Sequence, residues 1–307
     1  MTYDLPPRDF LGYGNKPPAI RWPNDARIAV SLVVNIEEGA ELNLSAGDER
    51  NESVHEIVLE VQDEPDLCME THYEYGTRAG WWRIMELLDR HNAKATMNTC
   101  GRAVALSPWI AQDAVKRGHE MSCHGWRWEG HAGMSEAVER ENIARAVQAI
   151  RDASGVRPIG LHTKSASSPR TRRLLVEEGG FLYDSNSYND DLPYVVEVLG
   201  KPHIVLPYSF DTNDMRFTKQ GGFTFGDDFA RYCIDALDWL WEEGRTAPRM
   251  MTIGLHLRII GRPGRIGGLA RFLDHAANKG GIWFARRDEI ARHWRQAVGL
   301  PAWQPAA

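Results

Sequence analysis

The apolar residues of this chain gather in short runs, which are separated by polar clusters and by amphipathic segments. The first run, Ile28 to Val34, reads IAVSLVV, is rich in β-branched residues and is bounded by polar positions. This pattern is typical of a strand buried on both faces of a sheet, because a half-exposed strand would alternate apolar and polar residues. Similar runs predict further strands near 95–98, 120–123, 159–161, 181–183, 204–206, 251–255 and 282–284.

Between these strands lie segments whose ends carry the residues that begin and end helices. Ser107, Pro108 and Gly118 bracket one helix as N-cap, first residue and C-terminal stop, and residues 168–179 repeat this arrangement. A third helix is expected to begin near Ser135, because apolar residues follow on one helical face. Further helices are expected at 78–91, 227–243, 264–278 and 287–298.

The alternation of strands and helices predicts a parallel sheet with crossover connections. A sheet of about seven such units often closes into a barrel, so we expect an α/β fold of the distorted (β/α) barrel type. In such barrels the chemistry lies where the strands end, because these ends and the loops after them converge on one face. The residues at the predicted strand ends are all polar: Glu37, Glu38, Asn98, His124, His162, Asp184, Tyr208, Asp211 and His256.

The N-terminal region differs from the rest of the chain in being rich in proline and glycine. This suits an extended arm, so we expect an arm over residues 1–24, one catalytic domain over 25–300 and a tail over 301–307. The acidic segment 41–75 has no clear period and is expected to be a long excursion after the first strand. The arm and the excursion both offer surface for self-association, so we expect a homo-oligomer with closed symmetry.

Composition and charge narrow the expected partners. With 43% hydrophobic and 25% charged residues, the chain has the composition of an ordinary soluble protein. The formal net charge is −6 and the basic residues are scattered, so nucleic acid is not an expected partner. No run approaches the roughly 20 apolar residues of a membrane helix, and the N-terminus lacks the pattern of a secretion signal. We therefore expect a cytoplasmic protein that acts on a small molecule and does not bind a membrane.

Five motifs follow one another along the chain: NIEEG (35–39), MSCHGWRW (121–128), GVRPIG (155–160), YDSNSYNDDLPY (183–194) and IGLH (253–256). In sequence and in order they resemble the motifs of the polysaccharide deacetylase superfamily. The resemblance covers roughly the whole chain and implies a barrel of the polysaccharide deacetylase type. Within the superfamily, the NxEEG start, EYGTRAGWWR (74–83) and GLHLRIIGRPGR (254–265) are more similar to the metal-independent allantoinases than to cell-wall deacetylases.

One departure from the superfamily pattern bears on the cofactor. Zinc catalysis in the superfamily needs an acidic residue and two histidines four residues apart, but the fourth residue after His124 is Trp128. An indole N–H is only a donor, and an ion held by Glu38 and His124 alone would bind weakly. We therefore expect no metal cofactor. The alternative is a rebuilt zinc site with Glu38, His124 and His131 as ligands, or with His162, which ends another strand.

The absence of a metal would favour a particular substrate class. Without a cation, the pKa of the attacking water is not lowered from 15.7 towards about 7, and a plain acetamide becomes a poor substrate. A cyclic ureide or imide is easier to open, because its nitrogen leaves with its charge delocalised onto a second carbonyl. We predict a hydrolase of a non-peptide C–N bond in an allantoin-like ring. The alternatives are a metal-dependent deacetylase of a polysaccharide or N-acetyl amino sugar, and an inactive ligand-binding relative.

The resemblance also implies roles for three catalytic residues. Glu37 aligns with the general base and is predicted to take a proton from water, which requires burial beside Glu38 to raise its pKa. His256 aligns with the histidine on the acid side and would protonate the departing nitrogen. His124 would orient the water or polarise the carbonyl.

Other polar and aromatic residues of the motifs are predicted to bind substrate. The acidic residues of the fourth motif are expected to contact His256, Arg157 or substrate N–H groups, and Arg258 to contact an anionic group. Typical allantoinases differ from this chain at residues 131–132 and 165–166, which would alter the pocket. The predicted substrate-binding residues are Glu38, Trp126, Trp128, His131, His162, Asp184, Tyr188, Asp191 and Arg258.

Overall fold

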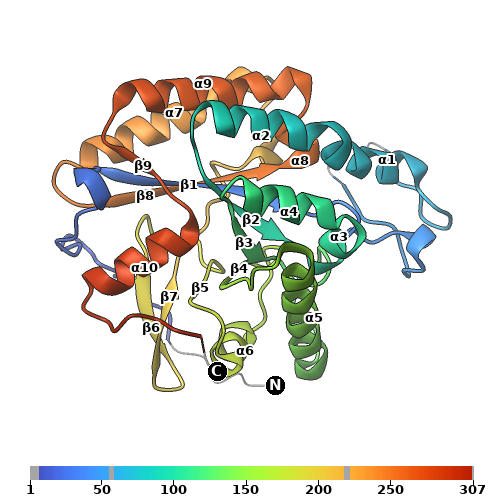
Figure 1. Cartoon of the computed structure of the whole chain (residues 1–307), viewed down its shortest axis with the longest axis horizontal. Helices are drawn as coiled ribbons and strands as arrows, with labels where there is room; N and C mark the ends of the chain where they lie inside the picture. Colours follow the sequence, from blue (N-terminus) through green and yellow to red (C-terminus); the bar gives the residue numbers. More distant parts are fainter. Residues whose placement is uncertain (1–6, 55–58, 218–221, 306–307) are drawn as a thin grey trace.

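A curved and mostly parallel sheet lies at the centre of the computed structural model, which describes residues 7–54, 59–217 and 222–305 (Figure 1). Its strands are β1 Ile28–Ile36, β2 Ala95–Thr99, β3 Glu120–Cys123, β4 Gly160–Leu161, β5 Tyr183–Asp184, β6 Tyr194–Val198, β7 Lys201–Val205, β8 Arg249–His256 and β9 Ile282–Phe284. The strand order is β6-β7-β5-β4-β3-β2-β1-β8, with β9 also paired to β1. In the described part of the chain, β6 and β7 form the one antiparallel pair.

The sheet curves into a half barrel whose open side is partly closed by the segment after β7. Asn213 forms a parallel bridge with Gly254 of β8, and the Gly254 amide donates to the Thr212 carbonyl over 3.0 Å. Arg287 lies buried inside, where its guanidinium donates to the Leu206 carbonyl and to the hydroxyl of Thr252. The expected (β/α) barrel of mostly parallel strands is therefore confirmed.

The helices lie on the outside of this sheet, and most begin and end where the sequence predicts (Figure 1). Ser135 accepts a hydrogen bond from the Val138 amide at the start of α5, as expected of an N-cap. Helix α6 begins at Thr171 rather than at Pro169, because the Ser168 hydroxyl accepts from two backbone amides and holds a turn there. The α-helices are α1 Leu67–Tyr75, α2 Trp81–Arg90, α3 Gly101–Leu106, α4 Pro108–Lys116, α5 Glu136–Ser154, α6 Thr171–Glu178, α7 Gly226–Glu243, α8 Leu257–Ile260, α9 Pro263–Lys279 and α10 Arg287–Ala297.

The excursion after β1 is more ordered than its sequence indicates. It contains α1, which the Asp66 side chain caps by accepting from the Met69 amide over 2.9 Å. Only Met69 and Tyr73 of this helix are buried, so the apolar stripe is too short to give a clear period. Arg127 ties the excursion to the motif after β3 by donating to Asp48 and to the Glu41 carbonyl. Residues 55–58 of the excursion lie outside the described residues.

The described part of the N-terminal arm packs against the barrel. Trp22 is buried, and its indole N–H donates to the Arg249 carbonyl over 2.9 Å. The Tyr13 hydroxyl donates to the Pro193 carbonyl over 2.8 Å. The first six residues of the predicted arm and the last two of the predicted tail lie outside the described residues. Among the helices that are described, none is both long and apolar enough to span a membrane.

Candidate active site

Three of the strand-end residues converge on one point. Asn35, near the end of β1, is in register with Asn98 of β2 and with His256 of β8, so the residues that follow these strands share one edge of the sheet. Glu37 Oε1 lies 3.3 Å from His256 Nε2 and 3.5 Å from His124 Nε2. All three side chains are almost completely buried. The predicted base and the two predicted histidines therefore form one cluster.

The second oxygen of Glu37 is bound by an arginine. Arg258 follows β8 and donates to Glu37 Oε2 over 2.7 Å. Its guanidinium carbon lies 4.3 Å from the ring centre of Tyr73 and 5.1 Å from that of Trp128. Two aromatic rings and a carboxylate thus hold the guanidinium in place.

The charges around Glu37 lower its pKa, whereas the sequence led us to expect a raised pKa. Burial raises the pKa of Glu37, as the sequence led us to expect. The positive charges of His256 and Arg258 more than offset this and hold the pKa well below its usual range. Glu37 is therefore ionised at neutral pH. The expectation that its pKa is raised beside Glu38 is wrong, because it left out the cations.

Glu38 carries the raised pKa instead. Its Oε2 accepts a hydrogen bond from the Glu37 amide over 3.0 Å, and its Oε1 lies against Gly76, where a Cβ atom would come within 2.2 Å. Burial raises the pKa of Glu38 to about 7, opposed by Arg258 and assisted by Glu37. The side chain thus turns towards the end of α1 and not towards the two histidines.

Sequence reasoning missed the residue that binds the other side of His256. Asp214 begins a short 3-10 helix after β7 and is completely buried. Its Oδ1 lies 2.6 Å from His256 Nδ1, and its Oδ2 accepts from the amides of His256 and Ile260 over 2.7 and 3.1 Å. Burial lowers the pKa of His256, but Glu37 and Asp214 raise it to about 10, so the ring is an imidazolium at neutral pH.

The available sequence signal for Asp214 was its place three residues after Asp211, which the sequence predicts at a strand end. In the structure, Asp211 instead accepts from the hydroxyls of Ser209 and Tyr232 near the surface. The search for polar residues at strand ends therefore pointed to the correct segment after β7, but it selected Asp211 instead of Asp214.

His124 is held by a second histidine. The His124 Nδ1–H donates to the carbonyl of His162, because a carbonyl oxygen can only accept, and this leaves Nε2 facing Glu37. The His162 ring stacks on His124 at 5.5 Å and on Tyr208 at 4.3 Å. Burial and the neighbouring His124 hold the pKa of His162 well below its usual range, so its ring is neutral. His162 therefore supports His124 from behind.

Aromatic side chains continue outward from this stack. Tyr188 stacks on Phe210 at 4.0 Å and meets His162 edge-on at 6.2 Å. Lys164 Nζ lies 3.5 Å above the Trp128 ring and 3.0 Å from Glu52 Oε1 of the excursion. Trp128 and Tyr188, both predicted to line the pocket, thus lie around the cluster.

Four other predicted residues do not reach the cluster. Asp184 is buried between Arg172, at 2.7 Å, and His203, at 3.0 Å, so it does not contact His256. Asp191 is exposed. Trp126 packs beneath Arg145 of α5, whose guanidinium carbon lies 4.1 Å from its ring centre.

The fourth of these residues, His131, lies in a separate buried network. Its Nδ1 is 3.3 Å from Glu139, which also accepts hydrogen bonds from Ser168 and Thr171. The amides of His131 and Ala132 both donate to the Ala166 carbonyl. The two segments in which this chain departs from typical allantoinases are therefore in direct contact.

The alternative zinc site does not fit this arrangement. Of its three proposed ligands, Glu38 faces Gly76 and His131 is bound to Glu139, so only His124 points into the cluster. No group of three or more His, Cys, Asp or Glu side chains in the described ranges is arranged to hold a metal ion. In addition, the Arg258 guanidinium on Glu37 would repel a divalent cation. The version of the rebuilt site with Glu38, His124 and His131 is therefore not assembled.

Comparison with known proteins establishes the family. The family model described as polysaccharide deacetylase matches residues 62–183. A putative polysaccharide deacetylase of Schizosaccharomyces pombe is 38% identical, and the match covers 94% of this chain and 96% of that protein. The chain therefore belongs to the polysaccharide deacetylase family, and it is a hydrolase of that family.

Two solved structures narrow the likeness further. A probable polysaccharide deacetylase from Pseudomonas aeruginosa and a Puue allantoinase are each 46% identical to this chain, with a TM-score of 0.91. Each match covers 94% of this chain, and it covers 98% of the first structure and 97% of the second. The resemblance inferred from the five motifs is thus confirmed, both to the polysaccharide deacetylase family and to an allantoinase within it.

Proposed function

We propose that this protein hydrolyses a non-peptide C–N bond in a small cyclic ureide or imide, such as an allantoin-like ring, without a metal ion. The observation that carries this proposal is the environment of Glu37, whose one oxygen faces two imidazole nitrogens and whose other oxygen is bound by Arg258. The similarity over nearly the whole chain to a structure described as an allantoinase supports the ring-opening reaction.

In this proposal, Glu37 and His124 hold the attacking water. Within the described residues, Glu37 Oε1 accepts no hydrogen bond, although it lies 3.3 Å from His256 Nε2. The proposal places one proton on the His124 ring, at Nδ1 against the His162 carbonyl, so that Nε2 is an acceptor. Two acceptors 3.5 Å apart can take the two protons of one water molecule and direct its lone pair towards a carbonyl carbon.

His256 supplies the proton for the departing nitrogen. It is protonated at neutral pH because two carboxylates flank it, and its Nε2 points to the same place as Glu37 Oε1. Once His256 gives up its proton, one of the positive charges that depress the pKa of Glu37 disappears. Glu37 then becomes a stronger base at the moment when it must retain the proton taken from water.

Arg258 keeps Glu37 ionised and oriented throughout. Its guanidinium charge lies in a nearly dry site, where charge interactions are stronger than in water. This fixed cation beside the reacting carboxylate acts through Glu37, and we assign it as a positioning residue. Glu38, which faces Gly76, supports the loop and takes no part in proton transfer.

The proposal is tested by a substrate screen on the purified protein, paired with metal analysis of the same sample. The screen compares allantoin, hydantoins, dihydropyrimidines and succinimide with N-acetylated sugars, and Glu37→Gln serves as the control for contaminating enzymes. We expect turnover of at least one cyclic ureide or imide that Glu37→Gln lacks. Turnover of acetylated sugars alone, or activity that follows a stoichiometric metal, would overturn the proposal.

A further inference from the structure

Helix α7 presents an unusual face to solvent. Its inner face is buried through Phe229, Cys233 and Leu237, as expected of a helix that packs on a sheet. Its outer face carries Tyr232 and Trp239, which are 38% and 71% exposed, and Phe225, the residue just before the helix, is 69% exposed; the three are spaced seven residues apart. A solvated helix face is normally polar, and seven-residue spacing places side chains in one line along a helix. This line of aromatic residues ends at Trp239.

Carboxylates surround the exposed Trp239. The indole stands on one face of α7 together with Asp235, Asp238, Glu242 and Glu243, and its N–H donates to Glu243 over 2.8 Å. Three of these have cationic partners within the chain, since Asp238 is 3.1 Å from Lys279, Glu243 is paired with Arg249, and Glu242 is 3.0 Å from Arg245. Asp235 is exposed, and both side chains of the pair formed by Glu242 and Arg245 are exposed as well. The surface therefore offers an aromatic side chain with a negatively charged border.

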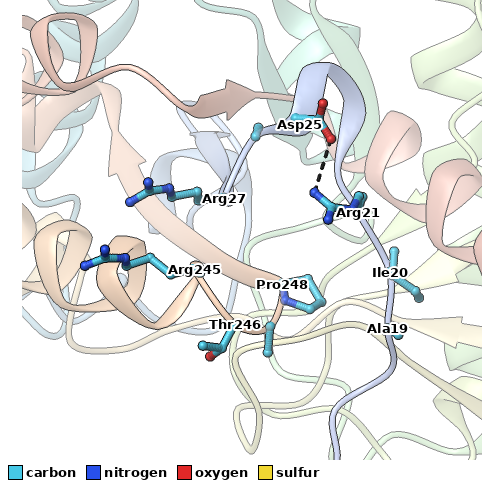
Figure 2. A pocket seen from close by; sticks show the side chains of 11 residues that line it. Ala19, Ile20, Arg21, Asp25, Arg27, Arg245, Thr246 and Pro248 are labelled. Carbon is cyan, nitrogen blue, oxygen red and sulfur yellow. Dashed lines mark hydrogen bonds and ion pairs between the residues drawn. The ribbon is translucent and has the colours of Figure 1, made fainter.

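The residues that follow α7 form a pocket of opposite character. Ala19, Ile20 and Arg21 of the N-terminal arm face residues 244–248 across a pocket of about 420 Å³ (Figure 2). Three arginines, Arg21, Arg27 and Arg245, and one carboxylate, Asp25, are among its lining residues (Figure 2). Arg27 also lies 3.8 Å from the ring centre of Trp241, and Arg245 is paired with Glu242. Arg21 and Asp25 are paired over 3.4 Å, but both side chains are more than 80% exposed, so this pair adds little stability.

We propose that a second copy of this chain docks here, with the Trp239 of each copy entering the arginine pocket of the other. The two patches are complementary in charge, and an indole bordered by carboxylates suits guanidinium groups through both ion pairing and cation–π contact. They are also adjacent, because residues 239–243 of the first lead directly into residues 244–248 of the second. A two-fold axis between adjacent complementary patches makes both contacts at once, which is the geometry of a closed symmetric dimer.

This arrangement also gives the N-terminal arm a role. Without Ala19, Ile20 and Arg21 the pocket would lack one wall. The contact lies at the start of β1 and β8, since Arg27 and Pro248 immediately precede these strands, whereas the reactive cluster lies at their opposite ends. The proposed contact therefore does not cover the reactive cluster.

The test is sedimentation velocity of the full chain and of variants, with circular dichroism to verify folding. At about 50 µM, far above the dissociation constant of a specific dimer, the wild type should sediment as a dimer or an even multiple. Trp239→Ala should shift it to the next smaller species, with each of the two equivalent contacts weakened roughly 30-fold, as for a buried interface hot spot. The matched control is Trp82→Ala, because Trp82 is also exposed, at 49%, but is stacked on Trp109 of the same chain.

A charge exchange separates this contact from a general loss of stability. Asp235→Arg and Arg21→Glu should each weaken the dimer, and the chain that carries both should regain it, because the two changes restore complementarity across the two-fold axis. A monomeric wild type, or a Trp239→Ala variant that associates like the wild type, overturns the proposal. The proposal is also overturned if the chain that carries both changes associates no more tightly than the single variant with the weaker association.

Discussion

The pair formed by His256 and Asp214 allows a quantitative prediction. Asp214→Asn keeps the size of the side chain and one acceptor oxygen but removes its charge. The pKa of His256 lies at about 10 instead of 6.5, a preference for the imidazolium of roughly 5 kcal/mol at about 1.4 kcal/mol per pH unit. Two carboxylates produce this rise against the effect of burial, so losing one of them should lower the pKa by about 2 pH units or more.

The assay is the pH dependence of kcat/KM, combined with an NMR titration of the His256 ring. His256 must carry its proton to act as an acid, so activity is lost as the pH rises through its pKa. We expect the alkaline limb of the wild type near pH 10 and that of Asp214→Asn near pH 8 or below. The unfolding free energy should also fall as the pH rises. Folding raises the pKa of His256, so the imidazolium stabilises the protein fully below pH 6.5, and this stabilisation is lost as the pH rises through about 10.

Asp184→Asn is the matched control. Asp184 is equally buried and also binds a histidine, His203, at 3.0 Å, but it lies outside the cluster. Its substitution should lower the unfolding free energy and leave the alkaline limb in place. If Asp214→Asn keeps its alkaline limb near that of the wild type, then His256 is not the acid or Asp214 does not set its charge, and the reasoning fails.

Three further predictions concern the base, its cation and the metal. Glu37→Gln should lower kcat by roughly 10²–10⁴ with little change in KM, and Glu38→Gln should be milder; near-normal turnover of Glu37→Gln would move the active site away from the end of β1. Arg258→Met should raise the pKa of Glu37, so that the acid limb of the kcat/KM profile moves to higher pH, whereas Arg258→Lys should retain part of the wild-type behaviour; an unmoved limb in Arg258→Met would contradict the assigned role. Dialysis against a chelator should leave activity unchanged, and activity that is lost on chelation and restored by zinc would refute the metal-free mechanism.

The sequence alone determined the succession of elements and the edge at which the chemistry lies. The apolar run from Ile28 and the capping residue Ser135 act locally, so their strand and helix can be read without a structure. Glu37, His124 and His256 were predictable as neighbours for a related reason. In a parallel sheet the residues that follow adjacent strands must share one edge, whatever the loops do.

Only the tertiary structure decided which charges meet at that edge. Asp214 reaches the cluster from a short 3-10 helix and Arg258 from helix α8, and the positions of both depend on the closure of the half barrel. These two residues set the pKa of His256 and Glu37. Tertiary contacts also decided which of the predicted residues lie outside the site. Glu38 is turned away by the space beside Gly76, and His131 is captured by Glu139. Side-chain direction and the sign of a pKa shift depend on partners distant in sequence, and local patterns carry no information about these partners.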